Sequence, residues 1–422
     1  MKIKTIKLPY KEVNNIQKAK KLKPKKPSII FRTLVKILSH GELKKARFKF
    51  TGEINKKGGP YLILMNHSSF IDLKIAHGIL YPMPFSVVST HDALVGKKWL
   101  MRNIGCMPTR KFVSDVSLIN DMRYMLNKKK TSVLMYPEAG YSFDGKATVL
   151  PDNFGRLVKI LNVPVVFITT NGAFHYDPLY NGLQLRKVPV SAHVETLFTK
   201  EQIEKLSLDE VNKIIEKAFS FDNFLWQKEE KIKIDEPFRA DGLERIIYRC
   251  ANCNAEGEMV GKGTTLSCKC CGKSYTLTEY GELKANEGET EFSHVPDWYA
   301  WQRQKIKEEI LLGEYSLDVP VEIGVIKDYK ALYMVGAGRL KHSAEGFELT
   351  SLDGQLNYKQ KTINSYGLNA DYFWYEMGDV IGIGDNNELY YCFPPKNVPV
   401  AKVRLATEEL YKIYKAKANN KE

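Results

Sequence analysis

Short apolar runs alternate with amphipathic stretches along the first half of this chain. Runs rich in β-branched and aromatic residues predict strands at residues 61–65, 85–90, 132–136, 164–170 and 188–196. Between them apolar residues recur every three or four positions, as at Phe154, Leu157, Val158 and Leu161, which is typical of a buried helix face. The alternation predicts a layered α/β domain with functional side chains at strand ends.

The second half of the chain follows a different pattern. A charged helix is expected at residues 296–312, followed by short strands at 321–326, 331–335, 346–350, 372–375, 380–384 and 388–393, and a last helix at 408–416. In its order of elements this region is loosely similar to a pleckstrin-homology or GRAM-like module. We therefore predict a β-rich C-terminal domain.

Positive charge is concentrated at the N-terminus. Residues 1–50 hold sixteen Lys and Arg against two Glu, which equals the net charge of +14 of the 422-residue chain. Six lysines crowd into residues 18–26, where Pro24 and Pro27 oppose helix formation. We expect a solvated basic arm here. Nucleic-acid binding is not expected, because the rest of the chain is formally neutral.

An amphipathic helix is predicted directly after this arm, with Phe31, Leu34, Val35 and Leu38 on one face. A basic segment beside such a helix suits an anionic membrane surface, and packing of the face into the protein core is the alternative. No apolar run reaches the roughly 18 residues of a transmembrane helix, and the first ten residues lack a signal-peptide pattern. We expect a cytoplasmic protein that associates peripherally with the membrane.

Five of the seven cysteines fall within residues 250–271. They include two CxxC pairs with the spacing of a zinc ribbon, formed by Cys250, Cys253, Cys268 and Cys271. Four thiolates complete the tetrahedral coordination of zinc, so the predicted role of the metal is structural. Cys270 is surplus and remains an alternative ligand. Reduced thiols in this pattern fit a cytosolic setting.

The most informative chemical pattern is a histidine and an aspartate five positions apart, His67 and Asp72, just after the first predicted strand. On a continuous helix these side chains would diverge by about 140°. They can meet if His67 lies in the turn and Asp72 in the first helical turn. The carboxylate would then accept Nδ1–H and leave Nε2 free to take a proton. A loop histidine beside an ordinary helix-start aspartate is the alternative.

A second cluster follows another predicted strand, at residues 136–142. The His67-x₄-Asp72 pair resembles the HX₄D motif of the glycerolipid acyltransferases, the 1-acylglycerol-3-phosphate O-acyltransferase family, and residues 136–142 resemble its FPEGTRS motif. Residues 105–110 lie where the family carries an Arg-containing acceptor motif, and residues 163–166 are similar to its fourth motif. The resemblance covers about residues 28–220.

The resemblance implies transfer of a fatty acyl group from a thioester, acyl-CoA or acyl-carrier protein, to a lysophospholipid hydroxyl in phospholipid biosynthesis. His67 would act as general base and Asp72 would orient its ring. Arg110 would hold an acceptor phosphate, because a guanidinium can bind two phosphate oxygens at once. Glu138 would face the acceptor hydroxyl or position Arg110, and Gly140 belongs to the same expected substrate site.

The chain departs from the family at residues 139–141, where Ala-Gly-Tyr replaces the usual Gly-Thr-Arg. The replacement removes a cation expected near the acceptor phosphate. A less charged acceptor would fit the change, as would a compensating cation such as Lys111, Lys146 or Arg156. The departure also supports a second hypothesis, a non-catalytic scaffold that binds membrane lipid through a degraded acyltransferase domain.

Four parts are therefore predicted along the chain. A basic N-terminal arm covers residues 1–27, and an acyltransferase domain covers residues 28–235. A zinc ribbon follows at residues 244–282. A helix and the β-rich domain occupy residues 295–422.

Overall fold

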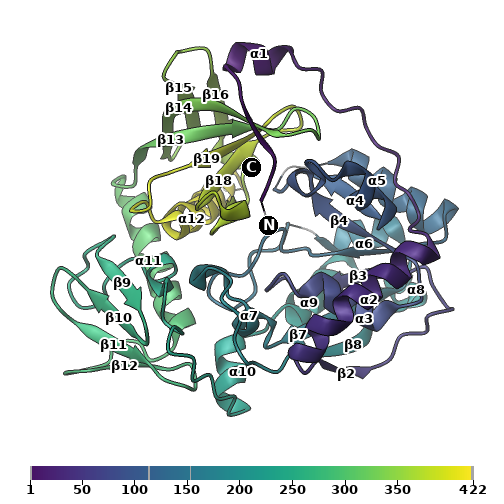
Figure 1. Ribbon diagram of the computed structural model, residues 1–422, viewed down its shortest axis with the longest axis horizontal. Helices are drawn as coiled ribbons and strands as arrows, with labels where there is room; N and C mark the ends of the chain where they lie inside the picture. The colour runs from purple at the N-terminus through teal and green to yellow at the C-terminus, as the bar shows by residue number, and fades with distance from the viewer. Residues whose placement is uncertain (1, 113–114, 153, 420–422) are drawn as a thin grey trace.

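A seven-stranded, mainly parallel sheet forms the N-terminal α/β domain. The computed structural model describes residues 2–112, 115–152 and 154–419 (Figure 1). The strands lie in the order β2-β8-β7-β3-β6-β4-β5, and β2 and β8 run antiparallel to the other five. Their bounds are β2 Lys49–Gly52, β3 Leu62–Met65, β4 Phe85–Thr90, β5 Cys106–Thr109, β6 Ser132–Met135, β7 Val165–Asn171 and β8 Ser191–Phe198.

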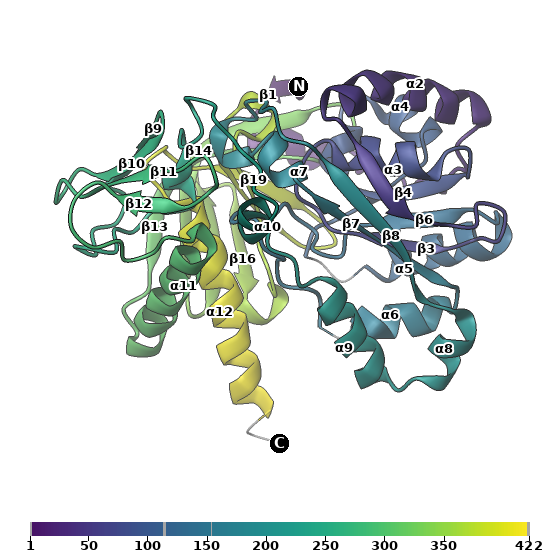
Figure 2. The same cartoon turned by 90° about the horizontal axis from the view of Figure 1, so that it is seen from below.

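Helices cover both faces of this sheet (Figure 2). Alternate residues of β3 show the reason: Leu62 and Leu64 are buried with α5, α6, α8 and α9, whereas Ile63 and Met65 are buried with α3. The bounds are α2 Ile29–Lys45, α3 Asp72–Leu80, α4 Lys98–Asn103, α5 Val116–Arg123, α6 Phe154–Leu161, α7 Ala173–Tyr176, α8 Lys200–Lys205, α9 Leu208–Ala218 and α10 Asn223–Glu229. The predicted layered α/β fold is confirmed.

The two strands that the hydrophobic pattern did not predict lie at the edges of the sheet. All four residues of β2 are exposed, so its sequence carries no apolar alternation. At the other edge, β5 is short and contains Pro108, a residue that edge strands tolerate. Edge strands bury little surface, and the hydrophobic signal is weakest there.

The cysteine-rich segment forms a small antiparallel sheet of four strands. The order is β12-β11-β10-β9, with bounds β9 Met259–Lys262, β10 Thr265–Cys268, β11 Ser274–Leu277 and β12 Leu283–Ala285. Trp298 of α11 (Val295–Leu312) is fully buried against Tyr275 of this sheet, and its indole Nε1 donates to the Arg249 carbonyl at 3.0 Å. The long helix α11 is therefore anchored on the cysteine-rich unit.

The C-terminal domain is an antiparallel sheet packed against α12 (Val400–Asn419). Its order is β16-β15-β14-β13-β19-β18-β17, with bounds β13 Leu317–Val325, β14 Leu332–Ser343, β15 Gly346–Ser351, β16 Asn357–Lys361, β17 Asn369–Asp371, β18 Val380–Gly384 and β19 Leu389–Phe393. The β-rich prediction is confirmed. The predicted strand at residues 372–375 is wrong, because Phe373 and Tyr375 have positive φ and form a turn. The last helix also begins earlier than predicted, directly after Pro399.

The N-terminal arm is only partly solvated, which corrects the sequence-based expectation. Its strand β1 (Thr5–Lys7) pairs in parallel with β14, and α1 (Tyr10–Asn15) buries Val13 in the C-terminal core. The lysine-rich residues 18–26 then run back to the α/β domain, where Lys25 Nζ donates to Asn103 Oδ1 at 2.6 Å. Charge alone predicted exposure, but Ile6 and Leu8 pack against the C-terminal core and β1 joins the sheet beside β14.

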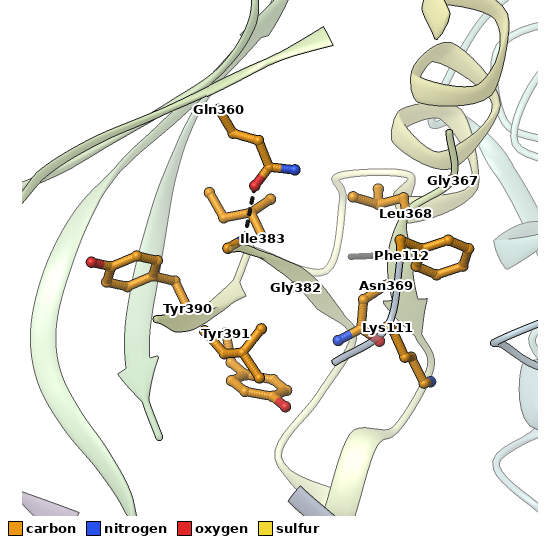
Figure 3. A pocket seen from close by; sticks show the side chains of 12 residues that line it. Lys111, Phe112, Gln360, Gly367, Leu368, Asn369, Gly382, Ile383, Tyr390 and Tyr391 are labelled. Atoms are coloured by element: carbon orange, nitrogen blue, oxygen red, sulfur yellow. Dashed lines mark hydrogen bonds between the residues drawn. The ribbon is translucent and has the colours of Figure 1, made fainter. Parts of the chain in front are cut away.

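The C-terminal domain lies against the carboxyl ends of β4, β5 and β6. After β4, Asp92 accepts hydrogen bonds from the hydroxyls of Tyr375 and Tyr391. After β5, Lys111 and Phe112 face Gly367 and Asn369 (Figure 3). The cavity between these groups has only about 10 Å³ of free volume, enough for roughly one water molecule. It is too small for a lipid.

Candidate active site and metal centre

The candidate pair His67 and Asp72 lies in the connection between β3 and α3. His67 follows the strand in a turn, and Asp72 is the first residue of the helix. Their side chains meet, with His67 Nδ1 3.0 Å from Asp72 Oδ2. The same oxygen accepts from the backbone N–H groups of Ser68 and Ser69, at 2.8 and 3.0 Å. One buried carboxylate thus fixes both the turn and the imidazole, and the proton on Nδ1 leaves Nε2 as the basic nitrogen.

Two tyrosine rings cover the faces of the His67 imidazole. The centroid of Tyr136 lies 4.1 Å from the imidazole centroid and that of Tyr141 lies 4.0 Å from it. Only 18% of the His67 side chain is exposed. Burial lowers the pKa of His67 below its ordinary value of 6.5; the Asp72 carboxylate opposes this shift and the charge of Lys111 adds to it. The imidazole is therefore neutral at neutral pH, as a general base must be.

Glu138 ties the second motif to the first through the backbone. Its Oε2 accepts the His67 N–H and its Oε1 accepts the Thr148 N–H, both at 2.8 Å, and the side chain is fully buried. Burial raises the pKa of Glu138 to about 8, and the two backbone donors oppose that shift. Both oxygens accept backbone N–H groups, and the expected role of Glu138 toward the acceptor or Arg110 stays a prediction. In the structure, Glu138 connects the backbone at His67 to the backbone at Thr148.

The 136–142 loop turns sharply after Glu138. Ala139 has a φ of +54°, a left-handed conformation that costs a non-glycine residue roughly 1–2 kcal/mol. The Ser142 N–H donates to the His67 carbonyl at 3.1 Å. Gly140 is buried, and a Cβ placed on it would meet only the Phe112 ring, at 4.0 Å. The expected place of Gly140 in the substrate site stays a prediction.

Arg110 and Lys111 follow β5 and approach different neighbours. The charge of Arg110 acts on His91 and on two tyrosines of the C-terminal domain, and its Nε has no hydrogen-bond partner among the described residues. The charge of Lys111 acts on His67 and on Asp371. Lys111 is therefore the cation of this loop that the imidazole senses.

The other two cations named from the sequence are placed elsewhere. Lys146 forms an ion pair with Asp222 at 3.6 Å. Arg156 is exposed on α6. Neither acts on the pKa of His67.

Sequence patterns did not identify two polar supports of the His67 turn. The Ser69 hydroxyl donates to Asp177, a buried carboxyl whose pKa burial raises to about 7. Before the turn, the side chain of Asn66 exchanges hydrogen bonds with the backbone of Thr170 on β7. Both supports come from more than 100 residues away in the chain, and no local signal links them to His67.

The four predicted metal ligands come together at one end of the small sheet. The Sγ atoms of Cys250 and Cys271 are 3.8 Å apart, those of Cys253 and Cys268 are 3.7 Å apart, and all four lie within 4.8 Å of one another. A tetrahedral ion with metal–sulfur bonds of about 2.3 Å requires sulfur separations of about 3.8 Å. The donor set fits a metal ion. Cys270 is exposed and is not a member of the cluster.

Comparison with known proteins assigns the α/β domain. Residues 47–170 match the model of the acyltransferase family. The chain therefore carries an acyltransferase-family domain. Among solved structures, the chain is similar to the 1-acyl-sn-glycerophosphate (LPA) acyltransferase PlsC from Thermotoga maritima, with 14% identity, a TM-score of 0.34 and coverage of 44% of this chain and 78% of that one. A search of curated sequences found no match.

The matched residues contain the loop that carries His67 and the loop that carries Glu138. The cysteine cluster and the β-rich domain lie outside the match. His67, Asp72, Arg110 and Glu138 all fall within the match. The chemistry of acyl transfer is thus to be sought at the carboxyl ends of β3, β5 and β6.

The cysteine cluster generates a direct prediction. Purified protein should contain one metal ion per chain, measured by elemental mass spectrometry. Cys268→Ser should lose the metal and lower the midpoint of thermal unfolding, because the ligand set becomes incomplete and metal binding contributes to folding. Cys270→Ser is the matched control and should retain the ion. Equal metal loss in both variants would contradict the assigned ligand set.

Proposed function

We propose that this protein transfers a fatty acyl group from an acyl thioester, acyl-CoA or acyl-carrier protein, to the hydroxyl of a lysophospholipid. The observation that carries the proposal is the 3.0 Å contact between His67 Nδ1 and Asp72 within an acyltransferase-family domain. An alcohol is a weak nucleophile at neutral pH and needs a base within reach. The imidazole Nε2 has no hydrogen-bond partner among the described side chains and is available for that task.

His67 alone can carry out both proton transfers of the proposed reaction. The acceptor O–H gives its proton to His67 Nε2 while its oxygen bonds to the thioester carbonyl carbon. The tetrahedral intermediate then expels the thiolate, which takes the proton back from the imidazolium. Asp72 stabilises the imidazolium and holds the ring. The chemistry requires no acyl-enzyme.

The acceptor should carry a phosphate near its free hydroxyl, and 1-acylglycerol-3-phosphate is the first candidate. Lys111 supports this, because its charge acts on His67 and no ion pair engages its ammonium group among the described residues. Arg110 precedes it and leaves Nε without a partner. Lys111 is the proposed phosphate contact, because it is the cation of this pair whose charge acts on His67.

Zinc is the proposed occupant of the cysteine cluster. Thiolates prefer zinc among the common divalent ions of cells, and the sulfur separations suit a tetrahedral site. The four thiolates leave no open coordination position, so the ion would hold the two knuckles together and would take no part in acyl transfer.

A lipid surface is the proposed partner of α2 and α4. The two helices touch through Phe31 and Trp99, whose ring centroids are 5.6 Å apart. Large side chains project from this α2–α4 patch with exposures of 43–74%: Ile30, Leu34, Ile37, Leu38, Trp99 and Leu100. The lysine-rich residues 18–26 border it, which suits anionic headgroups. None of the described helices is both long and apolar enough to span a bilayer.

A non-catalytic scaffold is the second candidate function. It is favoured by Tyr141, which stands in place of the family arginine and covers one face of the His67 ring. A scaffold would bind lysolipid without forming product.

A panel of lysolipids and labelled acyl thioesters, read by product mass, separates the two functions. Acyl transfer should be detected with a phosphate-bearing acceptor. His67→Ala should abolish it while the folded protein persists in circular dichroism, because the acceptor hydroxyl then lacks the proposed base. His193→Ala, at an exposed histidine on β8, is the control. Near-wild-type turnover of His67→Ala would refute the proposed base.

The pH dependence of kcat/KM gives a second prediction. Activity should fall as pH drops through the pKa of His67, because protonation removes the base, and burial puts that midpoint below 6.5. Asp72→Asn should move the midpoint lower still, since the carboxylate raises this pKa, and should reduce kcat by up to roughly 10⁴-fold. Asp92→Asn, a buried aspartate beside His91, should leave the midpoint in place. An acid limb above 6.5 would contradict the assignment.

Flotation with liposomes tests the α2–α4 patch. The double substitution Ile30→Asp and Ile37→Asp should weaken binding to anionic vesicles by at least about tenfold, because burying one such side chain is worth about 1.5–3 kcal/mol. The matched control is Leu311→Asp with Leu312→Asp, which changes two equally exposed residues on α11. Equal binding by both double variants would exclude this patch as the lipid contact.

A further inference from the structure

A side chain of the C-terminal domain reaches the loop that covers His67. Arg404 on α12 is 4% exposed and donates through Nη1 to the Tyr141 carbonyl at 3.0 Å. Its guanidinium lies over the ring of Phe143, 4.4 Å from the centroid. Arg404 therefore holds the loop at two positions, from a residue 263 positions away in the chain.

The loop itself packs into the C-terminal core. Phe143 is stacked on Tyr372 of the β-rich domain, with centroids 4.4 Å apart. Tyr141 and Phe143 belong to the hydrophobic cluster built mainly from the cysteine-rich and β-rich parts, and not to the two clusters of the parallel sheet. The orientation of this part of the loop is thus set by the appended domain.

The same loop contacts the imidazole. The Tyr141 ring lies on His67, and the Ser142 N–H donates to the His67 carbonyl. The contacts run without a break from Arg404 to the Tyr141 carbonyl, and from the Tyr141 ring to His67. Movement of the Tyr141 backbone would change the packing on one face of the base.

An ion pair with Glu408 does not by itself explain the position of Arg404. Glu408 Oε2 already lies 2.7 Å from Arg303 of α11, while Arg404 Nε is 3.3 Å from Glu408 Oε1. The Nη1 atom of the Arg404 guanidinium points away from Glu408 and toward the 136–142 loop. A guanidinium can serve a carboxylate, a carbonyl and an aromatic face together in a fixed plane.

We propose that Arg404 is a positioning residue of the acyl-transfer site, which keeps the Tyr141 ring on the His67 imidazole through the Tyr141 carbonyl. The C-terminal domain then completes the active site instead of merely accompanying it. The inference rests on the proposed function only in taking His67 as the base; its first test concerns the environment of His67 and needs no substrate.

Titration of the His67 Cε1–H signal by nuclear magnetic resonance tests the proposal on the full chain, with the signal assigned by its loss in His67→Gln. The titratable groups against His67 are Asp72 of α3, Lys111 after β5, and Glu138, Tyr136 and Tyr141 of the loop after β6. In Arg404→Lys and Arg404→Met the released loop should admit water, and the midpoint should rise toward 6.5 in both. The kcat for acyl transfer should fall by up to about a hundredfold through lost alignment, with KM for the thioester little changed.

Two comparisons make the outcome decisive. Arg303→Met removes an ion pair with the same Glu408 but no contact with the loop, and should leave the His67 midpoint unchanged. A shift of equal size in Arg303→Met, or no shift in the Arg404 variants, would overturn the proposal. A shift in Arg404→Met alone would assign the effect to charge and would overturn it too. If Arg404→Met does not fold, Arg404→Lys decides.

Failure of the proposed function would be recognised separately. Wild-type protein that forms no product with any donor and acceptor would refute acyl transfer, yet the titration of His67 would still report whether Arg404 positions the loop.

Discussion

A single carboxylate oxygen, Oδ2 of Asp72, organises the candidate site. It accepts from two backbone N–H groups of the turn and from the imidazole of His67, and it does so at the start of α3. The helix start is also where backbone N–H groups favour negative charge. The same contacts that begin the helix therefore fix the tautomer of the histidine. Removal of this carboxylate would leave three donors without an acceptor in a buried place.

Glu138 extends this arrangement across the sheet. Its two oxygens connect the backbone beside His67 to the backbone at Thr148, so the turns after β3 and β6 act as one unit. A carboxylate in a family motif invites a substrate-facing role, but a fully buried side chain with both oxygens occupied has little capacity left for one. The residue type was predictable from the motif, whereas its task depended on distances that only the fold provides.

The sequence predicted those parts that depend on local spacing. Alternating runs located five of the seven strands of the parallel sheet, the five-residue interval allowed His67 and Asp72 to meet, and the two CxxC pairs identified the four clustered cysteines. Contacts between distant segments could not be predicted this way. Pairing of β1 with β14, the bond from Ser69 to Asp177 and the reach of Arg404 all join segments without any shared periodicity.

The cysteine-rich unit, α11 and α12 are joined by successive contacts that end at the 136–142 loop of the candidate site. Trp298 and Gln302 fasten α11 to the backbone next to Cys250, and Arg303 fastens α11 to Glu408 on α12. One helical turn before Glu408, Arg404 holds the Tyr141 carbonyl. Each contact is buried or half-buried, so water offers little competition for it. The 136–142 loop, which carries Tyr141 where the resembled motif has arginine, is thus supported by an arginine from another domain. Its Ala139, held in a left-handed conformation that a glycine would adopt without cost, requires such external support.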